Sequence, residues 1–161
     1  HRLDRETSGV MIFAKHKRHK EYLQEQFANR SVHRIYHALI EGRPEKNNGI
    51  IHEWLLEDKF LRVKAVNKNH PNAKEAITYW SVEDSDEFAS LLSLTIETGR
   101  RHQIRVGLAN LGHPVVGDKQ HGAEGNPIGR IALHASSLEL LHPETDDPVR
   151  FEATIPFGPE N

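Results

Sequence analysis

The order of hydrophobic and polar residues along the chain predicts mostly β-strands. The run VMIFA at 10–14 is short and wholly apolar, which is typical of a buried strand. Residues 74–83 alternate in polarity and are rich in β-branched and aromatic side chains, so they predict a strand with one buried face. Further strands are predicted at 32–41, 50–57, 60–67, 88–97, 131–141 and 149–155.

Two segments have helical periodicity instead. Between 16 and 29, hydrophobic side chains recur at three- and four-residue spacing, and Lys and Glu fill the other face. A shorter helix is predicted at about 101–111, where aliphatic side chains share one face and Gly112 ends the pattern. The turn into this second helix begins at Thr98 or Gly99.

Loops separate these elements at 43–49, 67–72 and 113–130, each marked by Asn, Gly or Pro. Many strands and two helices that do not strictly alternate indicate the α+β class with a mostly antiparallel sheet. The chain has no internal repeat, no low-complexity segment and no linker that would divide it. We therefore expect one domain over residues 1–161.

Composition narrows the class of protein. The chain has 161 residues, of which 37% are hydrophobic and 27% charged, enough for one modest core and unlike a disordered or fibrous chain. No stretch approaches the roughly 18 consecutive apolar residues of a membrane helix. The chain has no cysteine, which excludes a disulfide framework or a Cys-based zinc site and fits a reducing compartment.

The formal net charge of −2 means that the chain as a whole is not a polycation. Any nucleic-acid binding must therefore come from a local basic face. Basic residues do cluster, once near 15–20 and again at 100–105. Such clusters also fit an ordinary solvated surface, so charge alone does not decide between the two interpretations.

The first segment that could perform catalytic chemistry is HRLDRETSG at 1–9, a polar stretch that leads directly into an apolar strand. Asp4 lies between two arginines, which favours its ionised form. Polar loops mounted on a rigid strand are typical places for active-site groups. The alternative is that Asp4 is only a turn residue.

The second segment is RIYHAL at 34–39. On a strand, Arg34, Tyr36 and Ala38 share one face. A tyrosine there could stack on a base and offer its hydroxyl for proton transfer. The alternative is a core tyrosine with a satisfied hydroxyl.

The third segment is TGRRHQIR at 98–105. If the helix begins near Arg101, then Arg101 and Arg105 lie one turn apart on the same face. Such a face could pair with a carboxylate and with RNA phosphates together. The alternative is an exposed basic helix face.

Twelve histidines raise the question of a metal site. His16 and His19 have helical spacing, but no HExxH motif occurs and no spacing indicates a third ligand. The phosphate loop, the GxGxxG dinucleotide fingerprint and the GxSxG hydrolase motif are also absent. We therefore expect neither a metal nor a cofactor.

Four segments, taken in order, resemble the RluA-type RNA pseudouridine synthase family. They are HRLDRETSG at 1–9, RIYHALIEG at 34–42, TGRRHQIRVGLANLGHPVVGD at 98–118 and RIALHASSLELLHPET at 130–145. The resemblance implies an isomerase that converts specific uridines of structured rRNA or tRNA to pseudouridine. It also implies an α+β fold with a mixed, mainly antiparallel sheet, a few packed helices and a central catalytic cleft.

The resemblance also implies roles for individual residues. Asp4 would be the catalytic carboxylate, Tyr36 would pack against the target base, and Arg105 would pair with Asp4. The residues expected to contact the substrate RNA are Arg2, Arg5, Thr7, Arg101, His102 and Gln103. The only partner implied is RNA, bound by a cytoplasmic monomer that needs no metal and no membrane.

The chain also departs from the family pattern. Gly107 stands where the family often has His, and His121 stands where an aromatic residue commonly precedes Gly122. Family members carry a segment before HRLD, so we expect residues 1–161 to be a catalytic domain truncated at its N-terminal side. Two alternatives remain: an inactive RNA-binding fragment of the same fold, and a metal-dependent or hydrolytic enzyme that uses the histidines.

Overall fold

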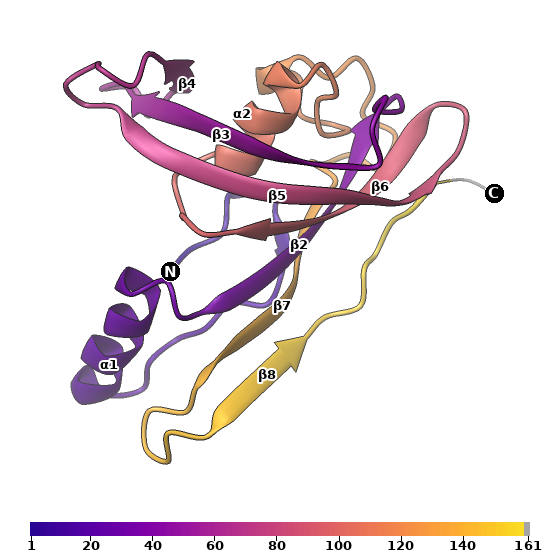
Figure 1. The fold of residues 1–161 in the computed structure, drawn as a ribbon. Coiled ribbons are helices and arrows are strands. Elements are labelled where there is room, and N and C mark those ends of the chain that lie inside the picture. Colours follow the sequence, from indigo (N-terminus) through magenta and orange to yellow (C-terminus); the bar gives the residue numbers. More distant parts are fainter. Residues whose placement is uncertain (160–161) are drawn as a thin grey trace.

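A computed structural model describes residues 1–159 of the chain (Figure 1). This part contains two helices and one short 3-10 helix: α1 (Lys17–Ala28), α2 (Gln103–Asn110) and η1 (Lys119–His121). The strands are β1 (Ser8–Gly9), β2 (His33–Glu41), β3 (Asn48–Glu57), β4 (Val63–Val66), β5 (Lys74–Ser85), β6 (Ala89–Ile96), β7 (Leu133–Leu141) and β8 (Pro148–Glu152).

All of these strands join one sheet, in the order β1-β7-β2-β6-β5-β3-β4, with β8 paired to β7. Every pairing between these strands is antiparallel except that of β1 with β7. The prediction of an α+β fold with a mixed, mainly antiparallel sheet is therefore confirmed. Figure 1 shows β2 and β7 crossing the middle of the molecule.

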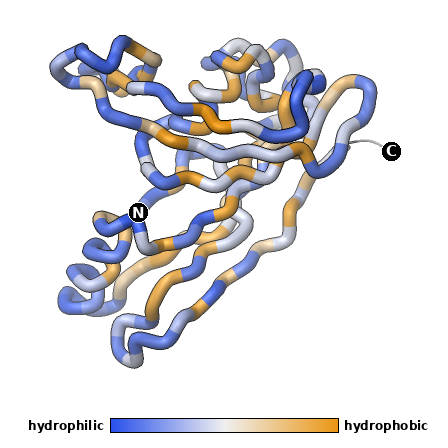
Figure 2. Tube along the Cα trace, viewed as in Figure 1, coloured by the Kyte–Doolittle hydropathy of each residue, from blue (hydrophilic) through white to orange (hydrophobic). Residues whose placement is uncertain are grey.

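The main core lies where the sheet is covered by α2 and the loop that follows it. Along β6, buried and partly exposed side chains alternate, as a strand with one covered face requires. Leu92 and Leu94 are fully buried in this core with Ile104 and Leu108 of α2. Figure 2 shows the same alternation of hydrophobic and hydrophilic positions along the long strands.

Helix α2 approaches β3 closely because residue 107 is glycine. A Cβ at Gly107 would lie 3.1 Å from the Cγ2 of Ile51 and 3.2 Å from the Oε1 of Glu53, closer than ordinary van der Waals contact. A larger residue would require the side chains of Ile51 and Glu53 to shift. The departure of Gly107 from the family pattern therefore affects packing.

Helix α1 packs against β7 near its C-terminal end. Leu23 is buried with Leu138 and Leu140 of that strand. The carboxamide of Gln26 exchanges two hydrogen bonds with the backbone of Leu141, at 2.7 and 2.9 Å, as a neighbouring strand would. Within residues 1–159, no helix is long and apolar enough to cross a membrane.

The prediction of a strand at 10–14 is wrong. After β1, only the amide of Val10 still bonds to β7, at the carbonyl of Ala135. From Ser137 onward, the same edge of β7 is taken by β8, so the apolar run has no strand left to pair with. Val10 and Ile12 instead pack against the α1 core, and Phe13 is exposed.

Other boundaries shift by a few residues. Strand β4 begins at Val63 rather than 60, because the Asp58 carboxylate accepts hydrogen bonds from the amides of Phe60 and Arg62 and closes a turn there. Strand β3 begins inside the predicted 43–49 loop, because Asn48 already pairs with Ser81 of β5. The predicted 113–130 loop also contains the short helix η1.

Candidate active site

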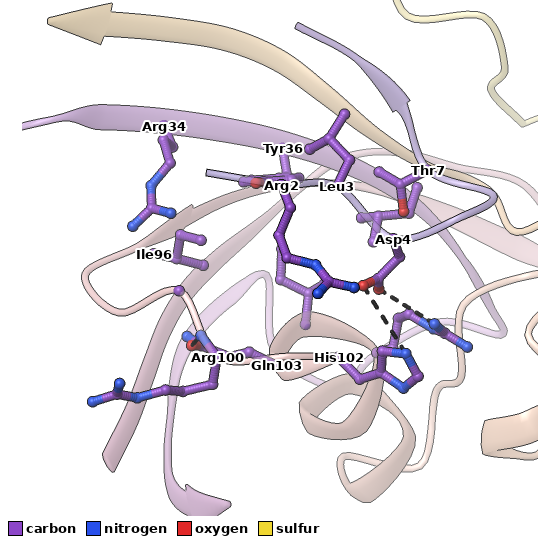
Figure 3. A pocket seen from close by; sticks show the side chains of 14 residues that line it. Arg2, Leu3, Asp4, Thr7, Arg34, Tyr36, Ile96, Arg100, His102 and Gln103 are labelled. Carbon is purple, nitrogen blue, oxygen red and sulfur yellow. Dashed lines mark hydrogen bonds and ion pairs between the residues drawn. The ribbon is translucent and has the colours of Figure 1, made fainter. Parts of the chain in front are cut away.

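One pocket collects most of its lining from three segments that lie far apart in the sequence (Figure 3). They are the loop before β1, strand β2, and the turn into α2 with the first residues of that helix; Ile96 of β6 and Leu133 of β7 add one side chain each. The polar side chains in its wall belong to Arg2, Asp4, Thr7, Arg34, Tyr36, Arg100, His102, Gln103 and Arg105. All three segments singled out in the sequence therefore contribute to the same pocket.

Asp4 is positioned by the turn that precedes β1. The amide of Thr7 donates a hydrogen bond of 2.9 Å to the Asp4 carbonyl oxygen, and β1 then pairs in parallel with β7. The hydroxyl of Ser8 lies 2.8 Å from the Nδ1 of His134 on that strand. Backbone and side-chain bonds therefore attach this loop to the middle of the sheet.

Gly9 is required for this attachment. Its φ of +119° is a conformation that side chains rarely adopt, and a Cβ there would lie 2.1 Å from the carbonyl oxygen of Ala135. We expect Gly9→Ala to separate β1 from β7 and displace Asp4. Stability to denaturant and turnover should therefore both fall.

The matched control for this prediction is Gly129→Ala. Gly129 also has a positive φ, of +72°, but a Cβ there would meet no atom within 4 Å. This variant should lose only the stability that an unfavourable backbone conformation costs, about 1–3 kcal/mol. Equal losses of stability in both variants would show that the contact with β7 does not matter.

Arg105 lies between two carboxylates. Its Nη1 is 3.3 Å from the Oδ2 of Asp4, while its Nε and Nη2 each lie 2.8 Å from an oxygen of Asp118. The Arg105 and Asp118 side chains are 5% and 1% exposed, whereas Asp4 is 18% exposed. The expected contact between Asp4 and Arg105 is present, but the bidentate pairing belongs to Asp118.

This arrangement fixes a permanent positive charge beside Asp4. Burial opposes the charge on Arg105, but the hydrogen bond and charge of Asp118, together with Asp4, hold the pKa of the guanidinium above its ordinary value. Because Asp118 takes two of its donors, Arg105 contacts Asp4 through one oxygen only. The other Asp4 oxygen, Oδ1, lies 4.0 Å from the Nε2 of His102.

Tyr36 reaches the pocket from β2. The pairing of β2 with β7 shifts register between Ile35 and Tyr36, an irregularity that can re-aim neighbouring side chains. Tyr36 is 8% exposed, and burial raises the pKa of its hydroxyl, with Arg34 acting in the opposite direction. The hydroxyl therefore keeps its proton at neutral pH.

Two histidines meet next to Asp4. The Nδ1 of His102 lies 3.1 Å from the Nε2 of His121, and the Nε2 of His102 lies 4.0 Å from the Oδ1 of Asp4. Burial and the charge of Arg105 lower the pKa of His102, although Asp4 acts in the opposite direction. Burial also lowers the pKa of His121. Both rings are therefore neutral at pH 7, one donating to the other.

These lowered values predict a loss of stability in acid. In the unfolded chain both histidines return to a pKa of about 6.5, so the unfolded state binds more protons. The contribution of the neutral pair to stability is complete above pH 6.5. It is lost as the pH falls through the lowered pKa values of the folded state.

We expect His121→Phe to reduce the drop in Tm between pH 7.5 and 5.5. His33→Gln, which removes an exposed histidine, is the control, and an equal change in both variants would contradict the prediction.

The prediction that Arg101 and Arg105 share a helix face is wrong. His102 has a left-handed φ of +54°, so α2 begins only at Gln103 and Arg101 lies outside it. The Nε of Arg101 is 3.0 Å from the Oε2 of Glu57 on β3. Arg101 lines a neighbouring pocket with Lys74 instead.

Gln103 was expected to contact RNA but uses its carboxamide inside the fold. Its Nε2 donates to the Thr78 hydroxyl at 2.9 Å and to the Ile77 carbonyl at 3.0 Å, and its Oε1 accepts from the Thr98 hydroxyl at 2.7 Å. The side chain is 4% exposed. Gln103 therefore ties the turn before α2 to β5.

The other residues expected to contact RNA differ in their positions. Arg2 is exposed and lines the pocket, whereas Arg5 is exposed and does not line it. Thr7 lines the pocket, and its hydroxyl is buried without a hydrogen-bond partner within residues 1–159. An RNA contact by any of the three stays a prediction.

Three residues of this site were missed at the level of sequence. Asp118 and His121 follow α2 in a stretch that is dense in turn residues, where the sequence indicates only a connector. Arg34 shares a strand face with Tyr36, a signal that could have identified it as a pocket residue. His121, noted from the sequence only as a departure from the family pattern, contacts His102 beside Asp4.

Within residues 1–159, no group of three or more His, Asp or Glu side chains is arranged to hold a metal ion. His19 lies beside His16, with 5.3 Å between the ring centroids, and its Nε2 is 3.3 Å from the Oε1 of Glu144. The pocket offers a carboxylate, a phenol that keeps its proton and a neutral imidazole. Such groups can attack a carbon atom or exchange protons with a bound ligand.

Comparison with known proteins adds an independent line of argument. Residues 1–110 match the model of the family described as RNA pseudouridylate synthase. A protein of Bacillus subtilis strain 168 named as an uncharacterised RNA pseudouridine synthase, YhcT, is 37% identical over 163 residues, covering 100% of this chain and 53% of that protein. Ribosomal large subunit pseudouridine synthase C of Yersinia pestis is 34% identical and covers 96% of this chain and 51% of that protein. The chain thus spans about half the length of these two relatives.

A solved structure is similar in fold as well. Human RNA Pseudouridylate Synthase Domain Containing 1 superposes with a TM-score of 0.84 at 28% sequence identity. The match covers 98% of this chain and 68% of that one. The sheet and helices described above are therefore those of an established architecture.

Proposed function

The chain belongs to the RNA pseudouridine synthase family, and from this premise we propose that it isomerises uridine in RNA to pseudouridine at the Asp4 pocket. The observation that carries the proposal is the meeting of Asp4, Arg105 and Tyr36 in one pocket. These residues come from three separate segments of the chain, and each has the chemistry that this reaction needs.

The reaction breaks the bond between the ribose C1′ and the uracil N1 and forms a bond from C1′ to C5. The C5 hydrogen leaves as a proton, and N1 gains one, so the rearrangement is balanced without an oxidant or reductant. Asp4 acts as a carboxylate that attacks the sugar or removes a proton from it. Asp4 lines the pocket, where the ribose would lie.

Arg105 balances the charge of Asp4 in a site that is partly shielded from water. A carboxylate withdrawn from water needs a compensating positive charge, and Arg105 supplies one while Asp118 holds the guanidinium in place. Arg105 is thus a positioning residue. Its plane is fixed by the bidentate pairing, so the direction of its Nη1 toward Asp4 is fixed as well.

Tyr36 supports the base. Its ring offers a flat surface on which a detached uracil can stack while it turns, and its protonated hydroxyl can donate a hydrogen bond to the ring. A uridine in folded RNA must be flipped out to reach this ring, which costs roughly a few kcal/mol. Basic side chains at the pocket rim, Arg2 and Arg100, can offset part of that cost through phosphate contacts.

We further propose that the substrate is rRNA or tRNA, that residues 1–161 make up the catalytic domain, and that the protein works in the cytoplasm as a monomer. The relative from Yersinia pestis has a name that points to the large ribosomal subunit, which makes rRNA the first substrate to test.

The proposal is tested by nucleoside analysis. Total RNA from cells that lack the protein is incubated with the purified full-length protein, digested to nucleosides and separated by chromatography. An increase in pseudouridine with an equal loss of uridine is expected. Binding of RNA with no such change would refute the proposal and favour a non-catalytic RNA-binding module.

A further inference from the structure

Arg34 is a half-buried cation in the pocket wall that the reaction outlined above does not use. It lies on β2, on the same strand face as Tyr36, and both side chains line the pocket. In the view of Figure 3, Arg34 and Arg100 lie toward one side of the pocket and Asp4 lies toward the other. Arg34 is therefore positioned to meet a ligand that Asp4 and Tyr36 also contact.

The charge of Arg34 is not balanced within the protein. Among residues 1–159, no Asp or Glu oxygen lies within 4.0 Å of its guanidinium, and its Nε is buried without a hydrogen-bond partner. Arg105 and Arg101, by contrast, each contact a carboxylate. Burial lowers the pKa of Arg34, as expected for a cation that lacks a counter-charge.

The guanidinium is nevertheless held in a defined place. It lies over the ring of Phe27 from α1, with 5.5 Å between its carbon and the ring centroid. On another side it lies against Gly99, where a Cβ would come within 2.8 Å of the Arg34 Nη1. A half-buried cation that lacks a counter-charge but is held in place by its neighbours is typical of an anion-binding group.

We propose that Arg34 binds a phosphodiester group of the RNA next to the target uridine. The inference rests on the proposed function, since it assumes that the uridine enters this pocket. A nucleotide whose base stacks on Tyr36 and whose ribose meets Asp4 carries a phosphate on either side of the sugar. The planar fork of an arginine matches the geometry of phosphate oxygens, and such contacts fix the register of a nucleic acid.

The test is the salt dependence of RNA binding. Arg34→Met removes the charge but keeps a stem that can pack on Phe27, and Arg34→Lys keeps the charge. Loss of one phosphate contact should reduce the slope of log K against log salt by about 0.7–0.9. Arg34→Met should show this reduction and bind RNA about tenfold more weakly, as expected for a charged hydrogen bond, while Arg34→Lys should keep the slope.

Arg150→Met is the matched control, because it removes the same charge from β8, outside the pocket, where Arg150 is paired with Glu152. It should leave the slope unchanged. An unchanged slope in Arg34→Met, an equal reduction in Arg150→Met or an equal reduction in Arg34→Lys would overturn the inference. If thermal unfolding shows that Arg34→Met does not fold, Arg34→Gln replaces it with the same expected slope.

Turnover measured on the same samples separates this inference from the proposed function. Pseudouridine formed by the wild-type protein, with a normal slope in Arg34→Met, would refute only the role of Arg34. For a true phosphate contact, Arg34→Met should raise KM more than it lowers kcat. A role limited to packing on Phe27 would lower thermal stability and leave the salt slope as it is.

Discussion

An Asp4→Asn variant is expected to lose turnover while its affinity for RNA stays near that of the wild-type protein. The amide has almost the shape of the carboxylate but cannot attack the sugar or accept its proton. We expect the rate to fall by at least about 10²-fold, the lower end for a positioned acid or base. Single-turnover conversion, with RNA binding titrated in parallel, measures both quantities.

The matched control for this substitution is Glu6→Gln. Glu6 is an exposed carboxylate two residues further along the same loop, so this change removes one negative charge without touching the pocket lining. It should leave the rate unchanged. An Asp4→Asn variant that retained substantial activity on a good substrate would show that another group performs the chemistry.

Replacing Arg105 with Ala is expected to have the largest effect on stability. The change leaves Asp118, 1% exposed, without the guanidinium that satisfies both of its oxygens. Removal of one partner from a buried ion pair costs about 3–5 kcal/mol. Denaturant unfolding should show a loss of this size, and turnover should fall as well, because Asp4 loses its counter-charge.

A double variant separates the two effects. Arg105→Met combined with Asp118→Leu replaces the buried pair by apolar side chains and leaves no stranded charge, so much of the lost stability should return. Turnover should stay low, because Asp4 still has no cation beside it. Recovery of activity together with stability would mean that Arg105 acts only through folding, and the role beside Asp4 would then pass to another residue.

Local pattern predicted the strands and helices that have one covered face. Residues 74–83 alternate in polarity because one side of β5 faces the core, and the 16–29 segment is periodic because one side of α1 packs on β7. The apolar run at 10–14 misled because only Val10 and Ile12 pack against the α1 core, while β8 occupies the strand edge that the run would need. Competition for a sheet edge is a tertiary property that a short window cannot contain.

The residues of the candidate site were likewise predicted only in part. The sequence singled out Asp4, Tyr36 and Arg105 within motifs, and the structure brings them into one pocket. Arg101 was misplaced because His102 adopts a left-handed conformation that stops the helix from starting earlier, and the periodicity of the sequence does not show this. Asp118 was missed because its importance lies in a contact across 13 positions of sequence, which neither spacing nor composition reveals.

The arrangement also explains how a carboxylate can work in a partly buried pocket. Asp118 anchors Arg105, Arg105 faces Asp4, and Gly9 lets the loop that carries Asp4 join β7. Each of these links is set by the fold rather than by the substrate. The pocket is therefore organised before RNA arrives, which is the condition for an electrostatic contribution to catalysis.

The most direct test of the central claim is tritium release from RNA transcribed with uridine labelled at C5. The hydrogen at that carbon must leave when C1′ bonds to it, so release reports the isomerisation itself. Full-length protein should release tritium in step with pseudouridine formation, and its Asp4→Asn variant should release none above background. Binding of the labelled RNA without release, or equal release by both proteins, would contradict the account.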